Sequence, residues 1–203
     1  SVSQGFPGEV RSKTFTQREI KVMEASKAII HTDFGDITLK FFPKLAPNHV
    51  NNFIELTKTG FYNGTIFHRV IPGFVIQGGD PNSKSHEKAR HGMGGPGYRL
   101  KAEFNSKPHK RGILSMARSS QPDSAGSQFF ICVSDVPSLD NKYTVFGEVT
   151  QGMDVVDKIN ALPTSRSGPF SGDVPVNTVL IYHVIPYQEP ETTDARKKQP
   201  SPP

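Results

Sequence analysis

The chain has 203 residues and a mass of 22.3 kDa, which suits one domain with extensions better than two domains. Its formal net charge of +5 is mild and comes mostly from loops and a tail, so nucleic acid is not an expected partner. A single cysteine, Cys132, excludes an intramolecular disulfide and a multi-cysteine zinc site, and its apolar neighbours predict a buried structural thiol.

No apolar run reaches the roughly 20 residues that a membrane-spanning helix needs, so we expect a soluble protein. The sequence begins with Ser1 and shows no signal-peptide segment. It does not distinguish a cytoplasmic protein from one exported after removal of a leader.

Residues 1–27 are predicted to form a partly helical extension, because residues 16–27 are polar with scattered apolar side chains. The core pattern begins at Ala28. Residues 28–31 and 36–42 flank a turn signal and predict a β-hairpin. Pro47 and the apolar residues that follow it at three- to four-residue spacing predict a helix over residues 46–57, which Gly60 ends.

Residues 66–77 contain two short strand-like segments that meet at the turn pair Pro72-Gly73, and they include Arg69. Burying an unpaired guanidinium costs several kcal/mol, so Arg69 needs a partner or a cleft. An arginine at the edge of an apolar pocket can bind carbonyl oxygens, which predicts a functional site. The alternative is a strand-edge arginine that pairs with a surface carboxylate.

Residues 79–111 form a long loop rich in Gly, Pro, Lys and His, and loops of this length are usually functional or mobile. Its histidines, His86, His91 and His109, have no carboxylate or thiolate at ligand spacing, so no metal site is predicted.

Beyond the loop the pattern predicts further strands and a second helix: strands at 112–116, 128–133, 144–149 and 178–185, and the helix at 152–159. About eight strands with two helices indicate a mainly β fold, namely a closed eight-stranded antiparallel β-barrel capped by two α-helices. An open two-sheet sandwich is the alternative. Residues 187–203 are rich in Pro, Glu, Thr, Lys and Ser and are predicted to be a disordered tail.

Three motifs carry a family resemblance: residues 67–80 (Phe-His-Arg-Val-Ile-Pro-Gly-Phe-Val-Ile-Gln-Gly-Gly-Asp), 112–117 (Gly-Ile-Leu-Ser-Met-Ala) and 126–131 (Gly-Ser-Gln-Phe-Phe-Ile). In this order they resemble the cyclophilin-type peptidyl-prolyl cis-trans isomerases over residues 28–186. The resemblance implies an antiparallel barrel with a substrate groove on its outer face, a monomer, and catalysis without a cofactor or metal.

The resemblance also implies the site. Arg69 matches the catalytic arginine, with His68 behind it. The other implied substrate-binding residues are Phe74, Val75, Phe130 and Leu139 around the proline ring, Gln77 on the substrate backbone, Gln128 beside the groove, Ala117 and Arg118 on the strand along the peptide, and Tyr143 where many members have His.

Rotation about an X–Pro bond faces a barrier of about 18–20 kcal/mol, and because no bond is broken the reaction requires no nucleophile, metal or redox cofactor. The expected partners are proline-containing peptides and unfolded or folding proteins. Cyclosporin-type cyclic peptides should bind with reduced affinity, because Ser138 stands where the family often has Trp. The alternative function is a weakly active or inactive proline-peptide binding module or chaperone.

Overall fold

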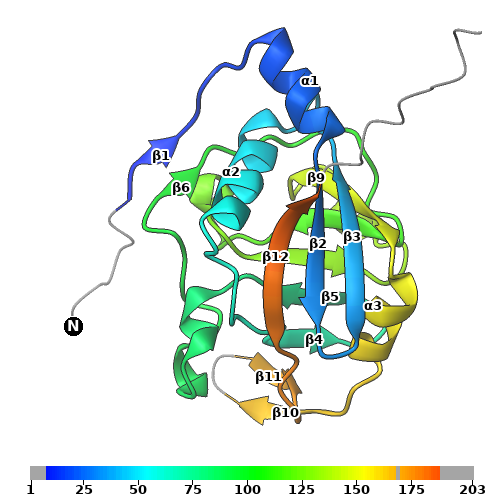
Figure 1. The fold of residues 1–203 in the computed structure, drawn as a ribbon. Coiled ribbons are helices and arrows are strands. Elements are labelled where there is room, and N and C mark those ends of the chain that lie inside the picture. Colours follow the sequence, from blue (N-terminus) through cyan, green and yellow to red (C-terminus); the bar gives the residue numbers. More distant parts are fainter. Residues whose placement is uncertain (1–7, 168–169, 188–203) are drawn as a thin grey trace, which may run out of the picture.

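A computed structural model describes residues 8–167 and 170–187 (Figure 1). Eight strands form one sheet, in the order β12-β2-β3-β9-β7-β8-β5-β4, and all neighbours pair antiparallel. Their bounds are β2 (Lys27–Thr32), β3 (Gly35–Phe41), β4 (Arg69–Ile71), β5 (Val75–Gly78), β7 (Ile113–Met116), β8 (Phe129–Cys132), β9 (Val145–Gln151) and β12 (Ile181–Tyr187). The mainly β fold with eight antiparallel strands that the sequence predicts is confirmed.

The expectation of a closed barrel is corrected in one respect, because the first and last strands of the sheet, β12 and β4, do not pair as a ladder. Three backbone hydrogen bonds join the segment before β4 to the start of β12 and the residues just before it: Gly64 N to Ile181 O (2.8 Å), Phe67 N to Val179 O (3.1 Å) and Ile181 N to Thr65 O (2.8 Å). β4 has only three residues and begins after these bonds, so it is too short to extend the seam.

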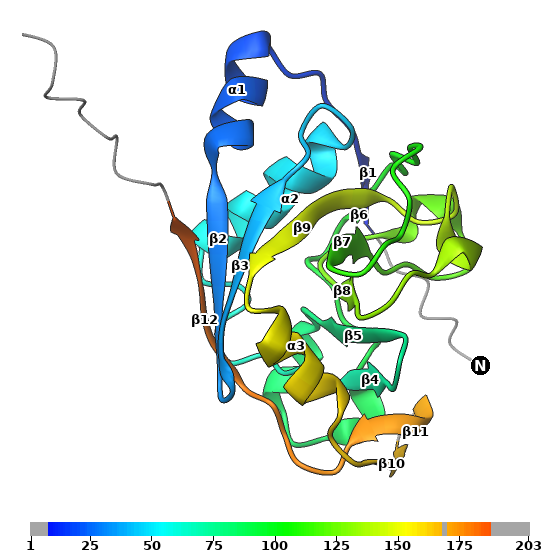
Figure 2. The ribbon, with the colours of Figure 1, turned by 90° about the vertical axis from the view of Figure 1, so that its right-hand side faces the viewer.

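Both predicted helices are present, as α2 (Pro47–Lys58), with Pro47 in its first turn, and α3 (Met153–Asn160). α2 packs against β12 and β9, and α3 packs against β3 and β5 (Figures 1 and 2). A third helix, α1 (Gln17–Ala25), lies where a surface helix was expected and begins with a capping box between Thr16 and Glu19. None of the helices in the described part of the chain is long and apolar enough to cross a membrane.

Two small sheets were not predicted. β1 (Val10–Arg11) pairs parallel with β6 (Arg99–Leu100), and β10 (Thr164–Ser167) pairs antiparallel with β11 (Phe170–Pro175). The long loop at 79–111 is also more ordered than expected, since it contains β6 and the 3-10 helices η1 (Pro81–Lys84) and η2 (Lys88–Arg90). Two more 3-10 helices, η3 (Pro122–Ser124) and η4 (Pro137–Leu139), flank β8. The predicted tail lies outside the described residues, apart from Tyr187.

The central strands bury side chains on both faces. Along β8, Phe129 and Ile131 join the main core, whereas Phe130 and Cys132 join a second apolar cluster on the opposite face. Burial, and to a lesser degree nearby carboxylates, raises the pKa of Cys132 to about 12, as expected for a structural thiol. β5 and β7 divide their side chains in the same way, so the second cluster forms an apolar patch on the outside of the sheet.

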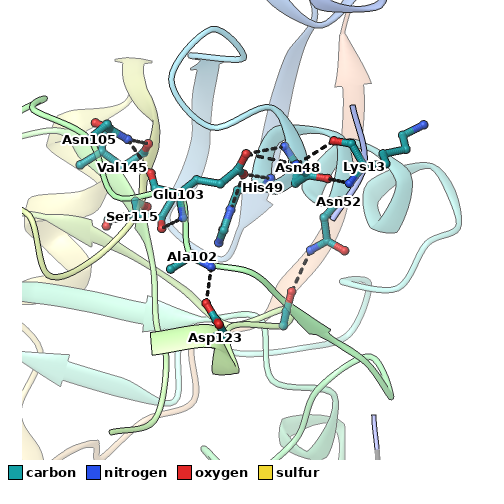
Figure 3. A network of polar contacts seen from close by, with 12 residues as sticks. Lys13, Asn48, His49, Asn52, Ala102, Glu103, Asn105, Ser115, Asp123 and Val145 are labelled. Atoms are coloured by element: carbon teal, nitrogen blue, oxygen red, sulfur yellow. Dashed lines mark hydrogen bonds and ion pairs between the residues drawn. The ribbon is translucent and has the colours of Figure 1, made fainter. Parts of the chain in front are cut away.

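A polar network ties the N-terminal extension to α2 and to the loop after β6 (Figure 3). Lys13 N donates to Asn48 Oδ1 (2.9 Å), and the Glu103 carboxylate accepts from His49 N (2.9 Å) and lies 2.7 Å from His49 Nδ1. Burial alone would raise the pKa of Glu103, but the hydrogen bonds and charge of His49 outweigh it and lower that pKa. The network therefore fixes the extension and the loop on one helix.

Candidate active site

The pairing register places four polar and aromatic residues in one line across the sheet. Arg69 on β4 lies opposite Gln77 on β5, Gln77 lies opposite Phe130 on β8, and Phe130 lies opposite Ser115 on β7. Neighbouring strands are about 4.8 Å apart, so roughly 10 Å of sheet separates the backbones of Arg69 and Phe130. We call this line the transverse row.

Three residues of the transverse row, Arg69, Gln77 and Phe130, border a cavity of about 1050 Å³. Ten of the eleven predicted site residues line it: Arg69, Phe74, Val75, Gln77, Ala117, Arg118, Gln128, Phe130, Leu139 and Tyr143. The exception is His68, which is 1% exposed and does not line the cavity, so it has no surface with which to contact a substrate. Met116 and Phe129, which were expected to support the core, are buried in it.

The apolar end of the cavity is the exposed edge of the second apolar cluster. Phe130 is almost buried, and the Tyr143 ring meets it edge-on at 5.7 Å between centroids. On another side, His109 stacks against Phe130 with ring centroids 6.1 Å apart and 17° between planes. Rings that are fixed by such contacts form a rigid apolar surface suited to a small ring such as proline.

His109 belongs to a buried chain of polar side chains beneath Phe130. Its Nδ1 lies 3.0 Å from Asp140 Oδ1, and its Nε2 lies 2.9 Å from Ser115 Oγ. The order Asp–His–Ser resembles a hydrolytic triad, but Ser115 is fully buried and also donates to the carbonyl oxygen of Thr144. Ser115 cannot contact a substrate, so these three hydrogen-bonded side chains support the pocket.

The polar end contains Arg69, whose Nε and Nη2 each donate to Asp173 Oδ2 at 3.3 Å. Beside it, Gln77 Nε2 donates to Gln128 Oε1 (3.0 Å), and Gln128 Nε2 donates to Gly94 O (2.9 Å). The two amides therefore link the transverse row to the glycine-rich loop on the other side of the cavity.

His68 lies behind Arg69, and its pKa is lowered to about 3. Burial is the largest cause, the charges of His91 and Arg69 add to it, and hydrogen bonding to Ile66 and Gln128 opposes it. His68 is therefore neutral at physiological pH, which agrees with its expected role as a packing and hydrogen-bonding group.

The far side of the cavity comes from the loop at 79–111, which the sequence predicted to be functional or mobile without assigning any of its residues to the site. Residues 92–99 line the cavity together with Asn82 and Arg90. The buried Asp80 carboxylate holds this loop by accepting from Asn82 N at 2.8 Å and from Gly92 N. At Gly94 a Cβ atom would lie only 2.1 Å from Asp80 Oδ1, so this position requires glycine.

Arg118 lies at the cavity edge, and its hydrogen bonds go to the backbone. Its Nε and Nη2 donate to Lys142 O at 2.9 and 2.6 Å, and Nη1 donates to Ser119 O at 2.9 Å. The guanidinium also lies 4.7 Å from the centroid of the Tyr143 ring. Arg118 thus holds Tyr143 and the adjoining turn in place.

A comparison with protein families matches residues 27–184 to the model described as cyclophilin type peptidyl-prolyl cis-trans isomerase/CLD. A peptidyl-prolyl cis-trans isomerase of Helicobacter pylori is 45% identical over 166 residues, which cover 80% of this chain and 97% of that protein. A probable peptidyl-prolyl cis-trans isomerase of Brucella abortus is 48% identical over 139 residues, covering 66% of this chain and 71% of that protein.

Two solved structures of a cyclophilin-type peptidyl-prolyl cis-trans isomerase of Cryptosporidium parvum share the fold. One has a TM-score of 0.72 at 31% identity and covers 81% of this chain and 99% of that chain. The other, determined in the presence of the dipeptide Ala-Pro, has a TM-score of 0.71 at 32% identity and covers 80% of this chain and 99% of that chain.

Proposed function

This chain belongs to the cyclophilin-type peptidyl-prolyl cis-trans isomerase family and its activity is the rotation of X–Pro bonds; we propose that Arg69 and the apolar pocket beside it carry out this reaction. The proposed substrates are proline-containing peptides and unfolded or folding proteins. The observation that carries the proposal is the transverse row, which sets the backbones of Arg69 and Phe130 roughly 10 Å apart at the border of one cavity.

Catalysis requires only that the protein bind the twisted amide more tightly than either planar form. Phe74, Phe130 and Leu139 hold the proline ring while the preceding carbonyl swings about the C–N bond. In the twisted state conjugation is lost and charge shifts between the amide nitrogen and oxygen. Arg69 donates hydrogen bonds to the groups whose charge changes, and the apolar side chains beside it strengthen that interaction by lowering the local dielectric constant.

The test is the isomerisation rate of an Ala-Pro tetrapeptide at low temperature, measured for the wild type and for Arg69→Ala. Loss of one preorganised donor set should lower kcat/KM about 100-fold, while peptide affinity changes little, because the pocket remains. Arg18→Ala, at an exposed position on α1, is the matched control and should behave as the wild type. A folded wild type without turnover would favour the alternative, a proline-peptide binding module or chaperone.

Cyclosporin-type cyclic peptides are proposed as weak ligands. Ser138 is exposed in η4 and does not line the cavity, so the chain lacks an indole at this rim. Ser138→Trp should strengthen inhibition by cyclosporin about 10-fold through added apolar contact, with little effect on uninhibited turnover. Inhibition titrations of both proteins test this; equal inhibition constants would show that Ser138 does not limit binding.

A further inference from the structure

The guanidinium of Arg69 and the carboxylate of Asp173 form an ion pair at the border of the cavity. Both Nε and Nη2 of Arg69 donate to the same oxygen, Asp173 Oδ2, at 3.3 Å. The two side chains are 32% and 26% exposed, so solvent screens the pair only in part. Arg69 lines the cavity and Asp173 does not.

Asp173 reaches Arg69 because β11 lies against β4, the last strand of the main sheet (Figure 2). The next residue, Val174, is 7% exposed and anchors β11 by burial. The pairing of β10 with β11 shifts register between Ser165 and Ser167, and Asp173 lies in this irregular part of the hairpin. Such irregularities commonly re-aim a side chain, here toward the sheet edge where Arg69 begins β4.

The ion pair uses two of the five N–H donors of Arg69, both on one edge of the group. Because the guanidinium is planar, holding one edge also fixes its plane. A long arginine side chain otherwise samples several rotamers, and transition-state stabilisation depends on donors that are already in place. A displacement of about 1 Å in a catalytic group can cost about 100-fold in rate.

We propose that Asp173 is a positioning residue that holds Arg69 by its Nε–Nη2 edge and so orients the guanidinium for a substrate amide in the cavity. This inference rests on the role of Arg69 proposed above. The opposite possibility is an inhibitory latch, in which the carboxylate competes with the substrate for Arg69. The geometry favours positioning, because Asp173 engages one edge of Arg69 from outside the cavity and leaves the apolar pocket open.

The test is a double-mutant cycle on the full chain, with Asp173→Ala, Arg69→Ala and the double variant assayed with the Ala-Pro tetrapeptide. Asp173→Ala should lower kcat about 10-fold with less than a twofold change in KM, because the defect lies in the orientation of a donor and not in the pocket. In the Arg69→Ala background the same change should have less than a twofold effect, since the two residues act as one unit.

Three further measurements serve as controls for the double-mutant cycle. Asp173→Asn keeps an acceptor oxygen and should retain more activity than Asp173→Ala. Asp154→Ala, on the exposed face of α3 and away from the cavity, removes one negative charge as a matched control and should keep wild-type kinetics. The NMR signal of the Arg69 Nε–H group should shift or broaden in Asp173→Ala and stay unchanged in Asp154→Ala.

The possible results distinguish a positioning role of Asp173 from an inhibitory latch and from a purely structural role. Faster turnover in Asp173→Ala would overturn positioning in favour of a latch. Equal losses in the wild-type and Arg69→Ala backgrounds would show that Asp173 only stabilises the hairpin. If Arg69→Ala loses turnover and Asp173→Ala does not, the positioning role of Asp173 alone is overturned. If neither variant loses turnover, the catalytic role of Arg69 is overturned as well.

Discussion

Two histidines near the cavity, His68 and His109, are buried and have lowered pKa values, with burial as the largest cause in both cases. The unfolded chain exposes both rings, so each then takes up a proton near pH 6.5, at a higher pH than in the folded protein. For His68 the folded pKa is about 3, so between pH 6.5 and 3 the unfolded state binds one more proton than the folded state. Stability therefore falls as pH falls through this range.

Replacing His68 should reduce the loss of stability that occurs as the pH falls. A group with a pKa of about 3 when folded and 6.5 when unfolded removes about 2 kcal/mol of stability between pH 7 and pH 5. His68→Gln cannot be protonated, so its free energy of unfolding, measured with urea at both pH values, should change by about 2 kcal/mol less than that of the wild type.

The exposed His86→Gln serves as the matched control for loss of an imidazole. The comparison uses the change in the free energy of unfolding between the two pH values and not its absolute value, because His68→Gln also alters packing. The same pH dependence in His68→Gln and the wild type would mean that His68 is protonated inside the fold.

At this scale the sequence predicted ten of the residues that line the cavity, but it missed Asp173 and the lining supplied by residues 92–99. The three motifs lie on strands β4, β5, β7 and β8, so side chains chosen from them lie side by side in the structure. Asp173 is 104 residues from Arg69 and comes from a hairpin without regular alternation, so no local pattern identifies it. Pairing of Arg69 with a carboxylate was the alternative to a functional site, and the structure combines the two, because Arg69 both pairs with Asp173 and lines the cavity.

Among the secondary-structure elements, those with clear periodicity were predicted, whereas the four strands of the two small sheets were not. α2 and α3 show apolar residues at helical spacing, and the hairpin of β2 and β3 shows alternation over many residues. β1 and β6 have two residues each, and two residues cannot display a period. Their pairing depends on contacts between segments almost 90 residues apart.

The pairing of β1 with β6 supports the cavity from outside. Arg99 N donates to Glu9 O (3.0 Å), Lys101 N donates to Arg11 O (3.1 Å), and the Arg11 guanidinium lies 3.9 Å from the centroid of the Tyr98 ring. Tyr98 and Arg99 both line the cavity, so β1 holds one side of it in place.

Arg11→Pro should therefore loosen that side of the cavity. Proline removes the backbone donor of this strand as well as the contact with Tyr98. We expect amide hydrogen exchange at Arg99 and Lys101 to become about 10-fold faster and KM for the tetrapeptide to rise about threefold, with kcat nearly unchanged. Arg11→Ala, which keeps the backbone pairing, is the control for the side chain alone. Unchanged exchange at both amides in Arg11→Pro would show that β1 does not support the loop.

For the molecule as a whole, the fold class and the order of the main elements were predicted because apolar residues recur along the strands. Successive apolar residues of the central strands pack on opposite faces of the sheet. How the sheet closes was not predicted, because closure depends on the length of β4 and on three bonds to a distant segment. Strand count alone cannot distinguish a continuous ladder from a short seam.

The seam between residues 64–67 and 179–181 also bears on how the protein is made. A ribosome releases the N-terminal part of a chain first, so Arg69 emerges more than 100 residues before Asp173 and the residues 179–181 that close the seam. Until residues 173–181 have left the ribosome, the sheet edge beside Arg69 has neither its carboxylate partner nor its closing bonds. The edge of the sheet that carries Arg69 is thus completed only after residues 173–181 have been synthesised.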